Sequence, residues 1–122
     1  MPDPNFVILY VNSPLASAAF YADLLGRPPV ESAPTFAMFV MASGVKLGLW
    51  ARHTVEPAAT ASGGGELAFM VADIAAVHAA HADWSKRGLS IAQVPTEMDF
   101  GTTFVALDPY GHRLRVYAPT AP

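Results

Sequence analysis

The 122-residue sequence predicts an α+β fold in which a βαβββ module occurs twice. Two observations predict it. A short apolar run precedes a helix-start signal in each half of the chain, and a glycine ends each predicted helix, at Gly26 and at Gly88. A supersecondary unit that is repeated in this way indicates two modules that share one core. We expect a single domain over residues 1–122, with module one at about 5–52, a linker at about 53–65 and module two at about 66–118.

Module one begins with a predicted strand over residues 6–11, a run rich in β-branched and aromatic residues. The helix after it starts at Ser13, whose hydroxyl can accept a hydrogen bond from the first turn, and Pro14 suits the first helical position. Gly26 suits the left-handed turn that ends a helix. Helical spacing predicts that one stripe of this helix is buried, formed by Leu15, Ala18, Ala19, Ala22 and Leu25.

Two further strands of module one are predicted at residues 34–41 and 45–50, where Ala42-Ser43-Gly44 can join them as a hairpin. The next segment, residues 51–66, is rich in proline, alanine and glycine. This composition is typical of a flexible linker, so we expect the most mobile part of the protein here.

Module two repeats the pattern. Asp73 can cap a helix over residues 74–87, and strands follow at 89–94, 102–107 and 113–117. Asp108-Pro109-Tyr110-Gly111 has proline and glycine where a tight β-turn needs them. The strand that begins at Arg113 alternates polar and apolar residues, which indicates that one of its faces is wet or lines a cavity. The apolar run at 67–71 is the first strand of this module, and βαβββ counted twice gives an expected total of eight strands.

Composition limits the classes of partner. Apolar residues make up 52% of the chain and charged residues only 14%, and a subunit interface is the ordinary place for such an apolar excess. The net charge of −3 argues against a nucleic acid as the main partner. No apolar run reaches the ~20 residues that span a bilayer. The chain has no cysteine and nothing in it resembles an export signal, so we expect a cytoplasmic protein.

Two motifs carry a family resemblance. Phe20-Tyr21-Ala22-Asp23-Leu24-Leu25-Gly26 is similar to the "FY…LG" helix of the vicinal oxygen chelate superfamily, and Asp108-Pro109-Tyr110-Gly111-His112 is similar to its "DPDG" hairpin. That superfamily includes glyoxalase I, extradiol dioxygenases and bleomycin-resistance proteins. The resemblance covers nearly the whole chain and implies an eight-stranded, cup-shaped sheet, with the cups completed across a homodimer that exchanges modules. The hairpin with Arg115 and Val116 resembles the antibiotic-binding, phenazine-resistance-like branch, as do Trp50 and Trp84.

The resemblance also tells where the enzymes of the superfamily bind their metal, on the first and last strands of each module. At those positions this chain has Phe6, Lys46-to-Trp50, Glu66 and Arg115. A divalent ion needs three or four N, O or S donors, which one carboxylate beside a guanidinium does not supply. We therefore expect neither a metal nor another cofactor.

Strand parity sorts the predicted strands into two faces. One face of each strand carries only aliphatic residues and phenylalanine, so we expect this face to pack under the helices. The remaining faces should line the cup, with aromatic walls and one or two fixed charges, as in small-molecule sites. The candidate ligand-binding residues are Tyr10, Gly48, Trp50, Glu66, Arg115 and Tyr117. Four phenylalanines could supply a ring on the other side of a ligand from Trp50: Phe36, Phe39, Phe100 and Phe104. Of these four, we place Phe39 and Phe104 in the candidate site.

Alternatives stay open for the main candidates. Trp50 either stacks on a ligand, with Gly48 as a floor that lets a flat molecule approach the backbone, or fills the cup and packs on a partner subunit. Arg115 either binds a carboxylate or phenolate or forms an internal ion pair with Glu66. His112 is expected to hydrogen-bond its own turn.

The sequence thus favours a binding protein that sequesters a planar aromatic compound, such as an antibiotic, and that has no catalytic residue. The alternative is a metal-dependent lyase or dioxygenase of the glyoxalase type with displaced ligands. A third hypothesis is a cofactor-free enzyme that uses Glu66 as a base.

Overall fold

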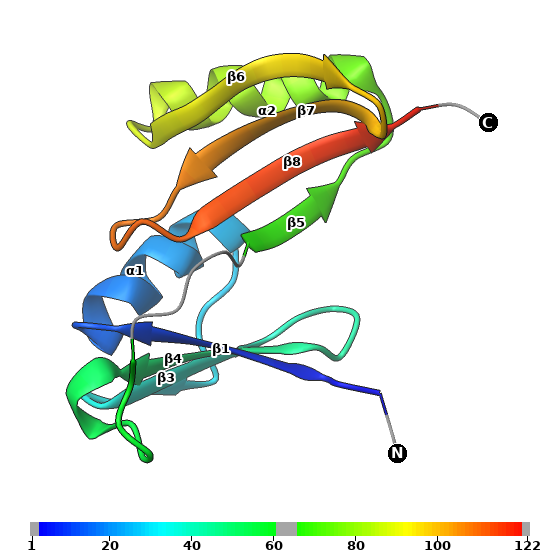
Figure 1. Cartoon of the computed structure of the whole chain (residues 1–122). Helices are drawn as coiled ribbons and strands as arrows, with labels where there is room; N and C mark the ends of the chain where they lie inside the picture. Colours follow the sequence, from blue (N-terminus) through cyan, green and yellow to red (C-terminus); the bar gives the residue numbers. More distant parts are fainter. Residues whose placement is uncertain (1–2, 61–65, 121–122) are drawn as a thin grey trace. The chain divides into compact units, whose positions relative to one another are not determined.

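The computed structural model describes residues 3–60 and 66–120, and the chain divides into two compact units, Met1–Ser62 (unit 1) and Gly63–Pro122 (unit 2). Within the described residues, each unit contains one α-helix and four strands in the order βαβββ, which confirms the predicted α+β fold (Figure 1). The eight strands form two four-stranded sheets, one in each unit.

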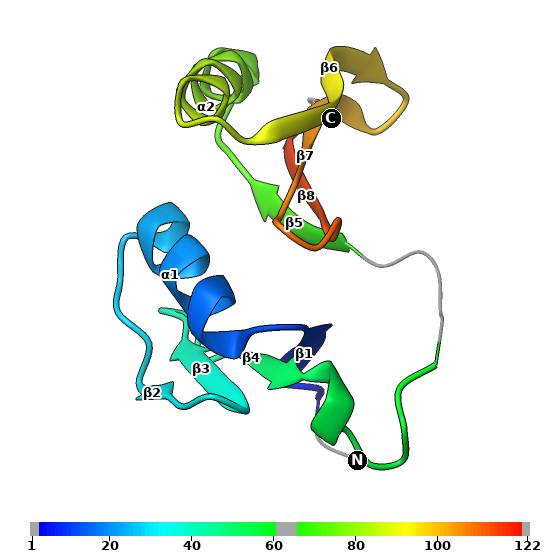
Figure 2. The same ribbon diagram turned by 90° about the vertical axis from the view of Figure 1, so that its left-hand side faces the viewer.

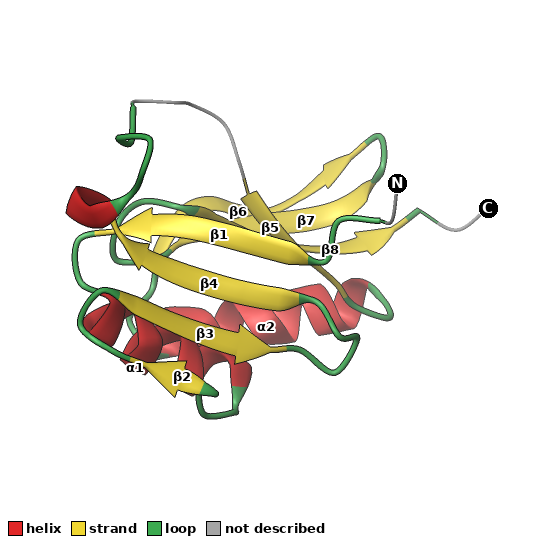
Figure 3. Cartoon of the chain, turned by 90° about the horizontal axis from the view of Figure 1, so that it is seen from below, coloured by secondary structure: helices red, strands yellow, loops and turns green. Residues whose placement is uncertain are grey.

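Unit 1 has the strand order β1-β4-β3-β2, which Figure 3 shows with α1 behind the sheet. Its elements are β1 (Phe6–Val11), α1 (Pro14–Leu25), β2 (Glu31–Ser32), β3 (Phe36–Val40), β4 (Lys46–Ala51) and the 3-10 turn η1 (Arg52–Thr54). β1 and β4 pair in parallel, whereas β3 pairs with both of its neighbours antiparallel. The short β2 completes the module.

The ends of α1 are as predicted, but its buried face is not. Ser13 accepts a hydrogen bond from Ala16 N at 3.2 Å, and Gly26 ends the helix at a φ of 68°. Ser17, Ala18 and Tyr21 are buried, whereas Leu15 is 48% exposed. The predicted stripe was therefore wrong in part, because an alanine-rich helix carries too little contrast between its faces to fix their orientation.

Unit 2 has the equivalent strand order, β5-β8-β7-β6, with α2 along one face of the sheet (Figure 2). Its elements are β5 (Glu66–Met70), α2 (Ile74–Lys86), β6 (Ser90–Met98), β7 (Gly101–Leu107) and β8 (Arg113–Pro119). β5 and β8 are parallel, and the remaining pairs are antiparallel. Asp73 caps α2 by accepting a hydrogen bond from Ala76 N at 2.8 Å, as predicted.

The core of unit 2 lies between α2 and its sheet. Val77, Phe104 and Val116 are buried there, and Phe69 and Trp84 pack against them. In unit 1, Phe39, Leu47 and Leu49 are buried to a similar degree. Each sheet therefore has one face covered by its own helix and a second, open face that this helix does not cover. The open faces are where the candidate site residues were expected.

The expected linker at 53–65 starts inside η1, and its residues 61–65 lie outside the described residues. Neither α1 nor α2, the two α-helices in the part of the chain that the structure describes, is long and apolar enough to cross a membrane.

Candidate functional site

The open face of unit 1 is aromatic. The parallel register places Tyr10 opposite Trp50, and the antiparallel register places Phe36 opposite Trp50 from the other side. The Tyr10 and Trp50 rings meet edge to face, with centroids 6.3 Å apart and planes at 82°. This arrangement is one that aromatic pairs prefer, because the positive edge of one ring faces the negative face of the other.

Gly48 lies in the middle of this face and makes room for two further rings. A Cβ at Gly48 would come within 2.7 Å of Cε1 of Phe6 and 3.0 Å of Cζ of Phe36. The rings from β1 and β3 therefore lie over the Gly48 backbone. The expectation that Gly48 leaves bare backbone for a flat ligand was wrong, because Phe6 and Phe36 cover it.

We call the resulting set, Phe6, Tyr10, Phe36 and Trp50, the aromatic surface of unit 1. Phe6 and Tyr10 are exposed, and Phe36 and Trp50 are half-buried. The ammonium of Lys46 lies 5.7 Å from the centroid of the Phe6 ring, a cation–π distance. Chemically, this surface offers large flat apolar groups and one phenol hydroxyl, which suits a planar apolar ligand.

The open face of unit 2 carries charge. Nε of Arg115 donates to Oε1 of Glu66 at 2.7 Å, and Nη1 of Arg115 donates to Oγ1 of Thr103 at 3.2 Å. The Thr103 hydroxyl in turn donates to the carbonyl of Val116 at 2.8 Å. Arg115 thus connects β5 and β7, the two strands that flank its own. The ion pair with Glu66, which the sequence left open, is present.

Two rings border this ion pair. The guanidinium carbon of Arg115 lies 5.8 Å from the centroid of the Phe100 ring, and Phe100 meets Tyr117 edge to face with centroids 6.3 Å apart. The Arg115 side chain is 18% exposed and the Glu66 side chain 34%. Within the described residues Nη2 of Arg115 has no hydrogen-bond partner. The guanidinium therefore keeps donors available for a carboxylate, phenolate or carbonyl oxygen.

Two candidates do not lie on the open faces. Phe39 is fully buried on the helix side of unit 1, where it pairs with Leu47. Phe104 is fully buried under α2, with the His81 and Trp84 rings at centroid distances of 5.3 and 5.4 Å. Their placement in the site was wrong, because the register puts each of them on the same face as core residues. We leave both out of the candidate site.

The sequence reasoning missed Thr103, the residue next to Phe104. Thr103 pairs with Tyr117 across the hairpin, so it shares the open face with Arg115. The position of the turn between β7 and β8 fixes which residues of the two strands pair. The sequence could therefore have predicted that Thr103 pairs with Tyr117.

The hairpin motif itself is structural. Asp108 Oδ1 accepts hydrogen bonds from the backbone N–H groups of Tyr110 and His112 at 2.9 and 2.8 Å. Nδ1 of His112 lies 2.7 Å from Asp108 Oδ2, and the Asp108 side chain is fully buried. His112 therefore binds its own turn, as predicted. The turn fixes where β8 begins and so places Arg115 on the open face.

The residues at the superfamily's metal positions do not fit a metal ion. Phe6 has no donor atom, and the Glu66 carboxylate is bound to the Arg115 guanidinium at 2.7 Å. Nowhere in the described ranges do three or more His, Asp or Glu side chains come together as a metal would require. A cation at Glu66 would also face the positive charge of Arg115.

The two βαβββ units and their sequence define the class of protein. The chain belongs to the glyoxalase/bleomycin resistance protein/dioxygenase superfamily, whose family model matches residues 4–116. It is similar to the phenazine antibiotic resistance protein EhpR of Enterobacter agglomerans, with 27% identity over 116 residues, 93% of this chain and 89% of EhpR. Both findings confirm the predicted resemblance.

Solved structures share the fold. A protein of Agrobacterium tumefaciens, determined by solution NMR, is 56% identical with a TM-score of 0.90, over 99% of this chain and 100% of that chain. A glyoxalase-related enzyme from Fulvimarina pelagi is 22% identical with a TM-score of 0.82, over 97% of this chain and 88% of that chain. The second similarity concerns the fold alone.

Proposed function

We propose that this protein binds a planar aromatic compound, such as an antibiotic, and sequesters it without converting it. The observation that carries the proposal is the aromatic surface of unit 1, where Tyr10 and Trp50 lie on a sheet face that α1 does not cover. Stacking on such rings adds about 0.5–1.5 kcal/mol per ring pair to the gain from burying apolar area. Protection of the cell would then follow from mass action alone.

Arg115 supports a preference for acidic ligands. Its guanidinium is anchored by Glu66 and Thr103 and retains the Nη2 donors, so it can bind a carboxylate or phenolate without first reorienting. Tyr117 and Phe100 provide flat surfaces beside it. We therefore propose the open face of unit 2 as a second ligand-contact surface, formed by Glu66, Arg115 and Tyr117.

The relatives support the same class of function. The name of EhpR states that it confers resistance to a phenazine antibiotic, and phenazines are planar aromatic molecules. At 27% identity this similarity suggests a class of ligand and does not identify the compound.

We also propose that the protein is a cytoplasmic homodimer. β1 pairs only with β4 among the described strands, and its Val7 and Ile8, which are not part of the aromatic surface, are 39% and 42% exposed. Apolar side chains on an unpaired strand edge are commonly covered by another chain. Light scattering at micromolar concentration should give twice the monomer mass, whereas a monomer would contradict this part of the proposal. Cell fractionation tests the location.

The two tryptophans allow a sharp test of ligand binding. Trp50 belongs to the aromatic surface, whereas Trp84 packs in the core of unit 2, between Phe69 and Phe104 at centroid distances of 5.8 and 5.4 Å. Trp84→Phe leaves Trp50 as the only indole, and Trp50→Phe leaves Trp84. Purified protein is titrated with phenazine and quinone-like acids while tryptophan emission is recorded.

Saturable quenching is expected in the wild type and in Trp84→Phe, with similar dissociation constants. Trp50→Phe should lose the saturable quenching, and Trp50→Ala should weaken binding measured by calorimetry about tenfold, which corresponds to about 1.4 kcal/mol. Absence of saturable quenching across a broad aromatic library, or equal quenching in Trp50→Phe, would overturn the proposal.

A further inference from the structure

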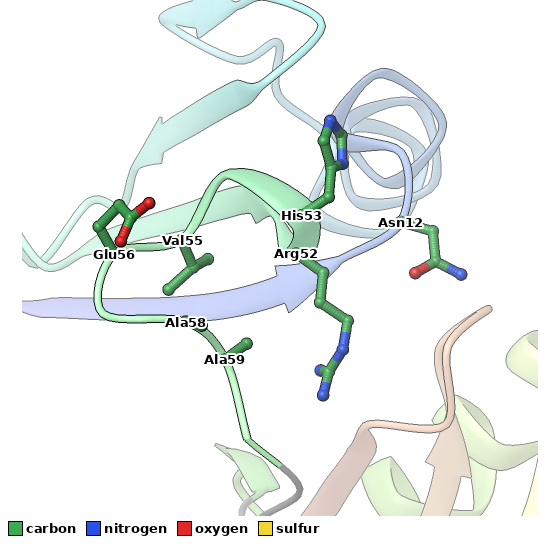
Figure 4. A pocket seen from close by; sticks show the side chains of 7 residues that line it. All are labelled: Asn12, Arg52, His53, Val55, Glu56, Ala58 and Ala59. Carbon is green, nitrogen blue, oxygen red and sulfur yellow. The ribbon is translucent and has the colours of Figure 1, made fainter.

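Unit 1 contains a hollow apart from the aromatic surface. It has a volume of about 480 Å³ and lies where β1 and β4 end (Figure 4). Its lining residues are Asn12, Arg52, His53, Val55, Glu56, Ala58 and Ala59. Phe6, Tyr10, Phe36 and Trp50 do not line it, so it is a different site from the one proposed above.

The topology explains why polar side chains gather at this hollow. β1 and β4 are parallel, and Val11 pairs with Ala51 at the ends of the two strands. The chain therefore leaves both strands at the same edge of the sheet, so that Asn12 and Arg52 are the next residues on each strand. Crevices at the carboxyl ends of parallel strands are where α/β sheets commonly bind ligands.

The hollow is rich in hydrogen-bond donors. The guanidinium of Arg52, the imidazole of His53 and the side-chain amide of Asn12 have no hydrogen-bond partner among the residues that the structure describes. Figure 4 shows the Glu56 carboxylate on the other side of the loop from the Arg52 guanidinium, and no ion pair joins the two within the described part of the chain. The fork of a guanidinium matches the oxygens of a carboxylate or phosphate. The Asn12 amide can add a further donor, whereas the His53 imidazole points away from the guanidinium (Figure 4).

Unit 2 has a hollow at the equivalent place with the opposite character. It measures about 560 Å³ and lies where the parallel strands β5 and β8 end. Asp73 and Glu97 line it together with Thr102 and Thr120, and none of its lining residues is basic. The fold thus provides a hollow at this edge in both modules, and only the sequence of unit 1 places cationic and N–H donor groups there.

We propose that the hollow of unit 1 is an oxyanion site, which binds a phosphate or carboxylate group of a small molecule through Arg52, with Asn12 as an additional donor. The hollow is open and its charged residues are exposed, so binding is weak, with a dissociation constant of the order of 1 mM for the isolated anion. A ligand with further groups to bury would bind more tightly.

Two-dimensional NMR of the amide groups tests the proposal in the full chain. Inorganic phosphate and acetate are titrated separately at constant pH and constant ionic strength, with chloride as the compensating anion. The amide signals of Asn12, Arg52 and His53 should shift in a saturable way with at least one of the two anions. Comparing them shows whether phosphate or carboxylate is the preferred group. The signals of Asp73 and Thr102, at the hollow of unit 2, should not saturate.

Three variants complete the test. Arg52→Gln should weaken binding about tenfold, and Lys86→Gln, which removes the same charge from the exposed end of α2, should leave it unchanged. Glu56→Gln removes a carboxylate that lines the hollow but points away from the Arg52 guanidinium, so it should tighten binding less than about twofold. If neither anion gives saturable shifts, or if Lys86→Gln weakens binding as much as Arg52→Gln, the hollow is not an oxyanion site.

Discussion

Arg115 and Glu66 form an ion pair across neighbouring parallel strands, with Nε and Oε1 2.7 Å apart on the open face of unit 2. Both side chains are partly exposed, so the pair contributes little to stability, about 0–1 kcal/mol. Its larger effect is to orient the guanidinium, because Glu66 and Thr103 hold it from two sides.

The first prediction concerns this pair. Glu66→Gln removes the competing carboxylate but keeps a hydrogen-bond acceptor, so affinity for an aromatic acid should rise about two- to fivefold. Arg115→Gln should lower it about tenfold or more. The measurement is calorimetry with an aromatic carboxylic acid and, as the control, its neutral amide. Equal changes for the acid and the amide would show that Arg115 does not recognise the charge.

The second prediction concerns Gly48. A methyl group at this position would overlap the space of the Phe6 and Phe36 rings, so Gly48→Ala should lower the free energy of unfolding by about 1–3 kcal/mol. Denaturant titration measures the change. In a Phe6→Ala background, where the nearest ring is absent, the cost of Gly48→Ala should fall, because the two changes share one contact. A cost that is unchanged in that background would mean that the Phe6 ring does not occupy this space.

The third prediction concerns Asp108. Its buried carboxylate binds two backbone N–H groups and the His112 ring, so Asp108→Ala should destabilise the protein by about 3–5 kcal/mol. His112→Gln removes the ring but leaves the two backbone hydrogen bonds, and should cost about 1–2 kcal/mol. Thermal unfolding ranks the two variants. The opposite ranking would show that the His112 ring, rather than the carboxylate, holds the turn.

Much of the fold could be predicted because its signals are local. Ser13 and Asp73 cap the helices, and Gly26 ends the first helix with a positive φ, all of which depends on a few neighbouring residues. The open-face position of Arg115 could also be predicted, since the turn at Asp108 fixes the register of the strand after it.

The remaining details depend on the partner strand and on packing. Phe104 was misplaced because its face follows from its pairing with Val116 rather than from its own strand. The buried side of α1 was missed because Ser17 and Tyr21 are not typical of a buried stripe in an alanine-rich helix. The rings over Gly48 belong to Phe6 on β1 and Phe36 on β3, two strands that are distant in sequence. No local sequence pattern predicts the side-chain conformation of either ring.

The hydrogen-bonded turn at Asp108 limits how this protein can change during evolution. Because side chains alternate along β8, the insertion or deletion of a single residue in the turn would exchange the open face of the strand with the face that α2 covers. Leu114 and Val116 would then face outward, and Arg115 would be pushed beneath the helix. Loop lengths at this hairpin are therefore restricted to changes that preserve parity, whereas point substitutions on the outward side leave the framework intact and can alter what the protein recognises.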